Sequence, residues 1–182
     1  MNYSRKQLIK DNKQSKFLFF WGHQLSTDGR VTASCFSQWW EESFTVEGVE
    51  YRSAEHWMMV GKAELFVDNE TKEKILKANT PGEAKKLGRS VKKFEASKWD
   101  KSKYEIVVEG NRHKFEQNPS LMEFLINTGN RVLVEASPVD PIWGIGMAAD
   151  NELANQPTRW KGENLLGFAL MEVRDILKNE NK

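Results

Sequence analysis

One stretch of the sequence, residues 53–63, is apolar almost all the way round and constrains the fold most. It reads Ser-Ala-Glu-His-Trp-Met-Met-Val-Gly-Lys-Ala, and at 100° per residue its apolar side chains cover most of a helix circumference. A helix with so little polar surface has to be buried, so other elements must pack around it. Ser53 is a typical N-cap, and we expect this helix to run to about Phe66.

The surrounding sequence predicts further helices and little strand. A cap, a proline and a glutamate at Thr80-Pro81-Gly82-Glu83 mark the start of a helix that ends at Gly88. The expected helices cover residues 53–66, 70–78, 80–87, 99–117, 118–127 and 164–177. The expected strands are a hairpin over 45–51, turning at Glu47-Gly48, and a β-like run over 131–136. The fold class is therefore mainly α with a small β component (α+β).

Length and composition favour one domain. At 182 residues the chain fits a single core, and we expect that domain over 17–178, with a flexible arm over 1–16 and a tail over 179–182. The single cysteine, Cys35, excludes an internal disulfide, which suits a reducing compartment. The longest early apolar run, 17–21, is too short for a signal peptide or a membrane span. These features predict a cytoplasmic protein that does not contact a membrane.

The nearly neutral charge of the chain conceals two biased stretches. The formal net charge is +1, which argues against a strongly basic nucleic-acid binder. Residues 85–103, however, hold eight lysines and arginines against two acids, whereas residues 41–73 hold nine acids against three bases. The basic stretch contains Arg89 and Trp99, which fits phosphate and ring binding. A solvated helix face is the alternative.

Two ionisable residues lie on one face of the buried helix. Glu55 and Lys62 are seven residues apart, which places them on the same face about two turns, or roughly 10 Å, apart. A buried charge requires a partner or an open cavity. The pair therefore indicates either structural ion pairs or a pocket in which a carboxylate and an amine have shifted pKa values.

Histidines give no sign of a metal site. His56 lies about 100° round the helix from Glu55, where a hydrogen-bonded core histidine is expected. His23, His56 and His113 have no metal-ligand spacing, so we expect no zinc.

A second candidate segment, residues 135–146, runs from a β-like stretch into a loop. Its Asp140 has the chemistry to act on a substrate or bind a hydroxyl group, and Trp143 can stack on a planar ring. Gly144 and Gly146 permit close backbone approach. The alternative is a rigid turn in which the carboxylate of Asp140 accepts backbone N–H bonds.

These motifs, in their order along the chain, resemble one known family. The residues that carry the resemblance are Phe36-Ser37-x-Trp39, Tyr51-x-Ser53-Ala54-Glu55-His56 with Lys62-Ala63, Ala84-x-x-Leu87-Gly88-Arg89, Trp99-Asp100, Arg112-x-Lys114-Phe115-x-Gln117-Asn118-Pro119, Glu135-Ala136-Ser137-Pro138-x-Asp140-x-x-Trp143-Gly144-x-Gly146 and Trp160-x-Gly162-x-Asn164-Leu165-Leu166-Gly167. Over about residues 17–178 the chain resembles the NADAR domain family, also called YbiA-like.

The resemblance implies an N-glycosidase, which splits the bond between a ribose and a nucleobase-like amine. Two substrate classes go with the family. One is the phosphoribosylamino-pyrimidine intermediates of riboflavin synthesis, and the other is ADP-ribose attached to guanine in nucleic acid. The implied partners are thus an ADP-ribose-type or ribose-phosphate small molecule, with ADP-ribosylated DNA or RNA as a further substrate. We expect no cofactor and no metal.

The resemblance also implies roles for single residues. Glu55 matches the carboxylate needed for cleavage, and Lys62 matches a lysine that attacks the anomeric carbon to form a Schiff base. Asp140 is the third expected catalytic residue, orienting ribose hydroxyls or stabilising the developing cation. The expected substrate-binding residues, with tryptophans as ring-stacking walls and Arg89 on a phosphate, are Phe36, Ser37, Trp39, His56, Arg89, Trp99, Trp143, Gly144 and Asn164.

The implied roles of Glu55 and Lys62 place opposing demands on the lysine. A lysine has to be unprotonated to attack carbon, whereas pairing with Glu55 would keep Lys62 charged, so Glu55 would have to serve mainly as a proton shuttle.

Two alternatives to this enzyme stay open. A module that binds ADP-ribose or another NAD-derived ligand without cleavage would use the same pocket. A nucleic-acid interaction module would use residues 85–103, and the near-zero net charge weighs against it.

Overall fold

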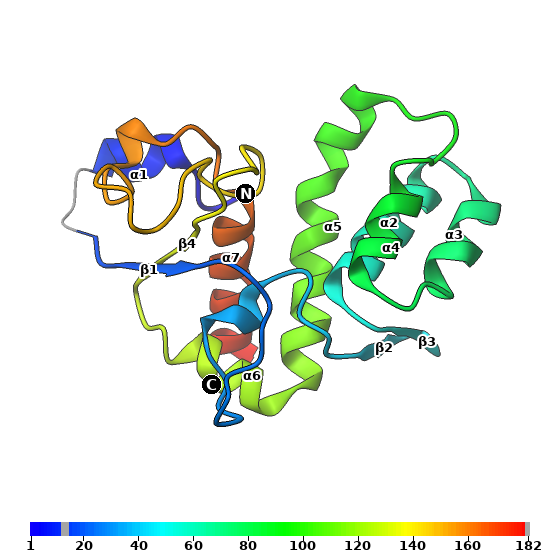
Figure 1. The fold of residues 1–182 in the computed structure, drawn as a ribbon, viewed down its shortest axis with the longest axis horizontal. Coiled ribbons are helices and arrows are strands. Elements are labelled where there is room, and N and C mark those ends of the chain that lie inside the picture. Colours follow the sequence, from blue (N-terminus) through cyan, green and yellow to red (C-terminus); the bar gives the residue numbers. More distant parts are fainter. Residues whose placement is uncertain (12–14, 181–182) are drawn as a thin grey trace. The chain divides into compact units, whose positions relative to one another are not determined.

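The computed structural model describes residues 1–11 and 15–180, and most of its elements are helices (Figure 1). Backbone contacts divide the chain into two compact units. The central unit is the continuous stretch Gln38–Pro119, and the terminal unit combines Met1–Ser37 with Ser120–Lys182. Mainly helical structure with a small β component is thus confirmed as the fold class.

Helix α2 (Ala54–Leu65) lies at the centre of the central unit. It packs against α3 (Asn69–Leu76), α4 (Pro81–Gly88) and α5 (Ala96–Gln117), as Figure 1 shows. Its buried residues, which include Met58 and lie on most of its circumference, confirm the burial predicted from its composition.

Capping side chains begin helices of the central unit. The Ser53 hydroxyl accepts from the backbone N–H of His56 at 3.4 Å, and that of Thr80 accepts from Glu83 N–H at 3.2 Å. Both caps confirm the predicted helix starts, because each satisfies a backbone donor that the first turn leaves open. Helix α5 starts at Ala96, three residues before the predicted position.

The predicted hairpin is present. Strands β2 (Phe44–Val46) and β3 (Val49–Tyr51) pair antiparallel, with the rings of Phe44 and Tyr51 stacked at 5.7 Å. The turn residues Glu47 and Gly48 have φ values of 51° and 79°, as a tight turn between twisted strands requires.

In the terminal unit, strand β1 (Phe17–Phe20) pairs parallel with β4 (Val132–Glu135), and α7 (Leu165–Glu180) packs against β4 (Figure 1). Strand β4 confirms the β-like run predicted over 131–136. Strand β1 is not predicted, because a short continuous apolar run without alternation does not by itself indicate a strand.

Shorter elements complete both units. Helix α6 (Pro119–Ile126) follows α5 directly, close to the predicted 118–127. Helix α1 (Arg5–Asp11) and two short 3-10 helices, η1 (Ala33–Phe36) and η2 (Pro157–Arg159), belong to the terminal unit.

The described part of the N-terminal arm differs from the flexible arm predicted. Residues of α1 are helical, the Tyr3 hydroxyl donates to Asp175 at 2.5 Å, and the Arg5 guanidinium donates to the Pro157 carbonyl at 2.8 Å. These side-chain bonds to distant segments fix an otherwise polar stretch. Of the predicted tail, 179–180 continue α7; residues 12–14 of the arm and 181–182 of the tail lie outside the described residues.

Among the helices of the described residues, none combines the length and the apolar character that crossing a membrane requires.

Candidate active site

Helix α2 places Glu55 and Lys62 on one face. Glu55 lies in the first turn, is 4% exposed, and donates its backbone N–H to the Gln38 carbonyl at 2.9 Å. Lys62 lies in the last turn and is half-buried. Met59 lies between them on the same face and packs against Gly88 of α4.

The ammonium group of Lys62 is covered by carbonyl and aromatic groups. It donates to the Gly88 carbonyl at 2.8 Å, and it lies 4.4 Å from the centre of the Phe94 ring and 5.7 Å from that of Trp99. The ring faces attract the cation, but the surrounding apolar matter removes water from it. The rings of Phe94 and Trp99 therefore cover the Lys62 ammonium, while the lysine side chain remains partly exposed to solvent.

Burial lowers the pKa of the Lys62 amine below its ordinary value, and the positive charge of Arg89 lowers it further. Both effects favour the neutral amine, because desolvation and a neighbouring cation each destabilise the ammonium form. A half-buried amine with a lowered pKa has the properties of a nucleophile.

His56 has the hydrogen-bonded core position expected of it. Its Nδ1 lies 2.8 Å from the Ser53 hydroxyl and its Nε2 lies 3.2 Å from the Ala78 carbonyl. Burial lowers the pKa of the imidazole, which favours the neutral ring. Because the Ala78 carbonyl can only accept, these partners assign the ring proton to Nε2. His56 thereby ties the start of α2 to the chain after α3, and its contact with substrate stays a prediction.

Other predicted residues of the central unit lie on α4 and near it. The Lys85 ammonium lies 5.7 Å from the centre of the Trp39 ring, and the same ring lies against Gly82. Arg89 caps the end of α4 and is exposed. Within this unit the structure thus brings Arg89 and Trp99 to Lys62, while Trp39 is held at the other end of α4.

The Asp140 loop, in the terminal unit, has the geometry of the rigid-turn alternative. Asp140 Oδ1 accepts from the backbone N–H groups of Ile142 at 2.9 Å and Trp143 at 2.8 Å. Gly144 is buried, and a Cβ there would lie 2.8 Å from the Glu135 carbonyl oxygen. The close approach that requires Gly144 is therefore made by the protein's own backbone, and the predicted substrate contacts of this loop stay predictions.

Asn164 and Phe36 have structural partners in the same unit. The Asn164 side chain is fully buried; its Oδ1 accepts from Glu135 N–H and its Nδ2 donates to the Leu133 carbonyl, both at 2.9 Å. The Phe36 ring is also fully buried and lies 5.5 Å from that of Phe20. Ser37 ends η1 with its N–H on the Ser34 carbonyl. Their contacts with substrate stay predictions.

Sequence reasoning missed Phe94. This ring is 46% exposed and lies nearer to the Lys62 ammonium than that of Trp99. The available signal was a large aromatic residue inside an otherwise polar, basic stretch, which a packed core does not explain.

A cavity of about 540 Å³ lies on the opposite face of α2 from Lys62. Its lining includes Trp57, Gly61 and Glu64 of α2 and Ser102 and Ile106 of α5. The helical position of Trp57 predicts a core residue, whereas the structure has it half-buried and lining this cavity. Its Nε1–H donates to the Ile106 carbonyl at 2.8 Å. The backbone at Gly61, one turn along, packs closely against α5, since a Cβ there would lie 2.9 Å from the Ile106 side chain. The cavity contains neither Glu55 nor Lys62.

Comparison with known proteins places the chain among named enzymes. The NADAR domain model matches residues 19–178. N-glycosidase R617 of Acanthamoeba polyphaga mimivirus is 44% identical over 165 residues, which are 88% of this chain and 95% of the relative. N-glycosidase YbiA of Escherichia coli is 29% identical over 97% of this chain and 98% of its own length.

A solved structure has the same fold. The NMR structure of the E. coli protein YbiA has a TM-score of 0.73 and 27% identity, and the match covers 93% of this chain and 89% of that one. Relatives named N-glycosidase support an enzyme that hydrolyses N-glycosyl bonds. Since the family model spans both units and a 44% identical relative is covered almost whole, the chain belongs to the NADAR domain family.

Proposed function

We propose that this N-glycosidase cleaves the bond between the anomeric carbon of a ribose and the nitrogen of a base, with the Lys62 amine as nucleophile. The observation that carries the proposal is the setting of that amine. It is half-buried, its pKa is lowered, and it lies beneath two aromatic rings suited to packing against a planar base.

The first chemical stage exchanges the base for the enzyme. The lone pair of the Lys62 nitrogen forms a bond to the anomeric carbon while the carbon–nitrogen bond to the base breaks. The electrons of that bond leave with the base nitrogen, which takes a proton from Glu55. Positive charge develops on the ribose as the bond breaks, and the carboxylate then stabilises it.

The second stage returns the enzyme to its starting form. The new Lys62 nitrogen loses a proton, the ring oxygen gains one, and the opened ribose is held as a Schiff base with a carbon–nitrogen double bond. Water adds across that bond with Glu55 taking a proton, and the lysine amine departs from the released ribose. Glu55 thus carries protons in both stages, which removes the conflict with a neutral Lys62.

The substrate classes follow from the groups around Lys62 and from the family. Arg89 presents an exposed guanidinium beside Lys62, which suits a phosphate on the sugar. ADP-ribosylated guanine in DNA or RNA, and phosphoribosylamino-pyrimidines, both join such a ribose phosphate to a planar amine. In this proposal Trp99 stacks on the planar base; the substrate roles of Asp140 and Trp143 stay predictions from the family resemblance.

The test is a side-by-side assay on an oligonucleotide carrying ADP-ribosylated guanine and on a phosphoribosylamino-pyrimidine. We expect turnover of at least one of them, a loss of at least about a thousandfold in Lys62→Ala, and a loss of about a hundredfold or more in Glu55→Gln. Borohydride added during turnover should fix the ribose to the peptide that contains Lys62.

Two control variants make the assay specific. Lys74→Ala removes a lysine whose ammonium binds Glu70 at 2.7 Å, and Ser102→Leu fills the cavity on the other face of α2; both should keep wild-type turnover. Wild-type rates in Lys62→Ala and Glu55→Gln contradict the proposal. Calorimetric binding of ADP-ribose with no cleavage of either conjugate would favour the non-catalytic binding module instead.

A further inference from the structure

The cover over Lys62 comes from one segment of the chain and its two ends. Residues 89–95 connect α4 to α5, and they supply Phe94 directly above the Lys62 ammonium. Gly88, at the start of this segment, accepts the bond from Lys62, and Trp99 lies just beyond its end. The environment of the amine therefore depends on where residues 89–95 lie.

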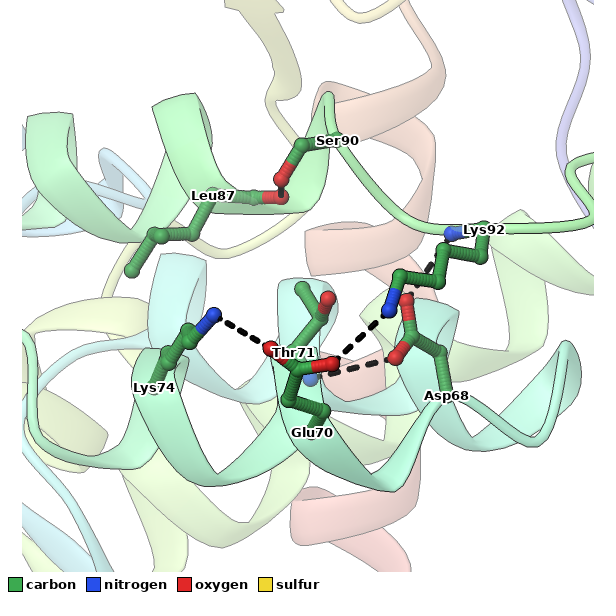
Figure 2. Close-up of polar contacts among 7 residues, drawn as sticks. All are labelled: Asp68, Glu70, Thr71, Lys74, Leu87, Ser90 and Lys92. Carbon is green, nitrogen blue, oxygen red and sulfur yellow. Dashed lines mark hydrogen bonds and ion pairs between the residues drawn. The ribbon is translucent and has the colours of Figure 1, made fainter.

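One buried carboxylate holds this segment in place. Asp68 is 6% exposed, and its Oδ2 accepts from the backbone N–H of Lys92 at 2.9 Å. Its Oδ1 accepts from the N–H of Thr71 at 3.1 Å and caps α3. Figure 2 shows both bonds meeting at this one side chain.

The backbone of Asp68 is tied to the helix that carries Lys62. Its N–H donates to the Ala63 carbonyl of α2 at 2.9 Å. The backbone thus fixes the residue to α2, while its two carboxylate oxygens fix α3 and Lys92. Asp68 is the point at which these three parts of the structure are joined.

The other polar contacts of this segment near Asp68 lie at the surface and fix it less firmly than the buried bond to Asp68. The Lys92 ammonium pairs with Glu70 at 2.7 Å on the surface, where both groups are mostly exposed (Figure 2), and exposed ion pairs of this kind contribute little. Ser90 donates to the Leu87 carbonyl within the same turn, at 2.7 Å (Figure 2). Lys93, with φ 55°, then turns the chain toward Phe94.

We propose that Asp68 is a positioning residue for Lys62: by accepting the Lys92 N–H it holds residues 89–95 so that Phe94 covers the lysine ammonium. Without that bond the segment loses its buried polar attachment and keeps the buried side chain of Val91 and the contact of Phe94 with Phe66 at 5.3 Å. The cover over Lys62 then loosens, and water reaches the amine more freely. The geometric part of this proposal is independent of the reaction, while its effect on turnover rests on the proposed function.

The charged groups that face Lys62 set the background for a pH test. Arg89 comes from the end of α4, Glu55 lies on the same face of α2, and Lys98 of α5 donates to the Leu65 carbonyl near the end of α2. None of these side chains is altered by a substitution at Asp68. Loss of the Asp68 charge would by itself move the Lys62 titration downward, so an upward shift reports the loss of its cover.

The experiment measures the titration of Lys62 directly in the full-length protein. The rate at which an amine-reactive reagent labels Lys62 is followed against pH by mass spectrometry of its peptide, without substrate. In Asp68→Asn one oxygen still caps α3, but the NH₂ group that replaces the other cannot accept from Lys92. We expect its labelling midpoint to move up by about half to one pH unit, so that labelling at a fixed lower pH is about three- to tenfold slower.

Three further variants keep the test decisive. Phe94→Ala removes the cover itself and should move the midpoint in the same direction. Asp68→Ser keeps a capping oxygen and loses the second acceptor, so it repeats the test if the Asn variant is poorly folded. Glu70→Gln removes the surface ion pairs with Lys92 and Lys74 but leaves the Asp68 bond intact, and it should label as the wild type does.

A midpoint that moves in Phe94→Ala but stays unchanged in both Asp68 variants overturns the proposal. An equal shift in Glu70→Gln also overturns it, because the surface ion pair would then be what positions residues 89–95. The absence of a shift in every variant overturns it as well. Turnover is measured alongside. If the labelling midpoints shift as expected but the wild type cleaves no N-glycosyl bond, the proposed function fails while the positioning role of Asp68 stands.

Discussion

Single residues decide how closely α2 and α4 approach. Gly88 lies where Met59 of α2 meets α4, and a Cβ at this position would lie 2.1 Å from the Met59 sulfur and 3.1 Å from its Cβ. The sulfur end of the Met59 side chain can rotate away, but its Cβ is fixed to the backbone and can move only if α2 moves. The same glycine supplies the carbonyl that binds Lys62, so the missing side chain keeps that carbonyl within reach of the amine.

We expect Gly88→Ala to lower the free energy of unfolding by about 1–3 kcal/mol, because the added methyl overpacks the contact with Met59. Urea denaturation measures this. Gly82→Ala is the matched control in the same helix, since its Cβ would lie 3.4 Å from the Trp39 ring, which is close but tolerable. Equal stability of the two variants would show that the contact at Gly88 is not tight.

At the scale of elements, strand β4 is closed on both edges. One edge pairs with β1. On the other, the Asn164 amide binds Glu135 N–H and the Leu133 carbonyl, in the way that a neighbouring strand would. Asn164 has φ 58°, and its own carbonyl accepts from Phe168 N–H at the start of α7. One side chain therefore ends the sheet and the adjacent backbone begins the helix.

We expect Asn164→Ala to destabilise the protein by about 2–4 kcal/mol, because two buried backbone groups of β4 lose their partners and a non-glycine residue without a polar side chain is held at positive φ. Asn164→Gly loses the same bonds without the φ strain, so thermal or urea unfolding should find it less destabilised than Asn164→Ala. Alanine equal to or better than glycine would mean that the left-handed backbone relaxes.

Elements with strong local signals were predictable, and those set by distant partners were not. Ser53 and Thr80 carry the chemistry of their caps in their own side chains, so the starts of α2 and α4 follow from sequence. Strand β1 has no such local sign, because what makes it a strand is β4, more than a hundred residues along the chain. Helix α1 is likewise held by bonds to distant segments.

The candidate site divides in the same way. That Glu55 and Lys62 share a face follows from their seven-residue spacing. That Phe94 covers Lys62 does not, because this depends on a loop whose path is set by Asp68. The family motifs predict that Asn164 and Gly144 bind substrate, and this stays a prediction. The contacts that the structure gives them are those of the strand–loop connection itself.

For the whole molecule, buried groups whose ionisation is disfavoured contribute to stability at both ends of the pH range. Burial raises the pKa of Tyr3 to about 12, with its bond to Asp175 adding to the effect, and burial also raises the pKa of Tyr51. The unfolded chain ionises these tyrosines near pH 10, so their contribution is complete below that pH and is lost as pH rises toward 12. Burial lowers the pKa of His56, so its contribution is complete above about pH 6.5 and is lost as pH falls below it.

We therefore expect the urea midpoint to decline below about pH 6.5 and again above about pH 10. Tyr3→Phe should start from a lower midpoint, because the bond to Asp175 is gone, but should decline less between pH 10 and 12. Tyr51 leaves part of the alkaline decline in that variant. An alkaline decline as steep in Tyr3→Phe as in the wild type would assign it to other groups.

The division of the chain also has a consequence for its synthesis. The central unit is one continuous stretch, whereas the terminal unit is made of the first and last parts of the chain. A ribosome therefore synthesises all of α2 to α5 after β1 and before β4, the strand with which β1 pairs. The helix that carries Lys62 can pack while the chain is still growing, and the parallel strand pair, which closes a loop of more than a hundred residues, forms only afterwards.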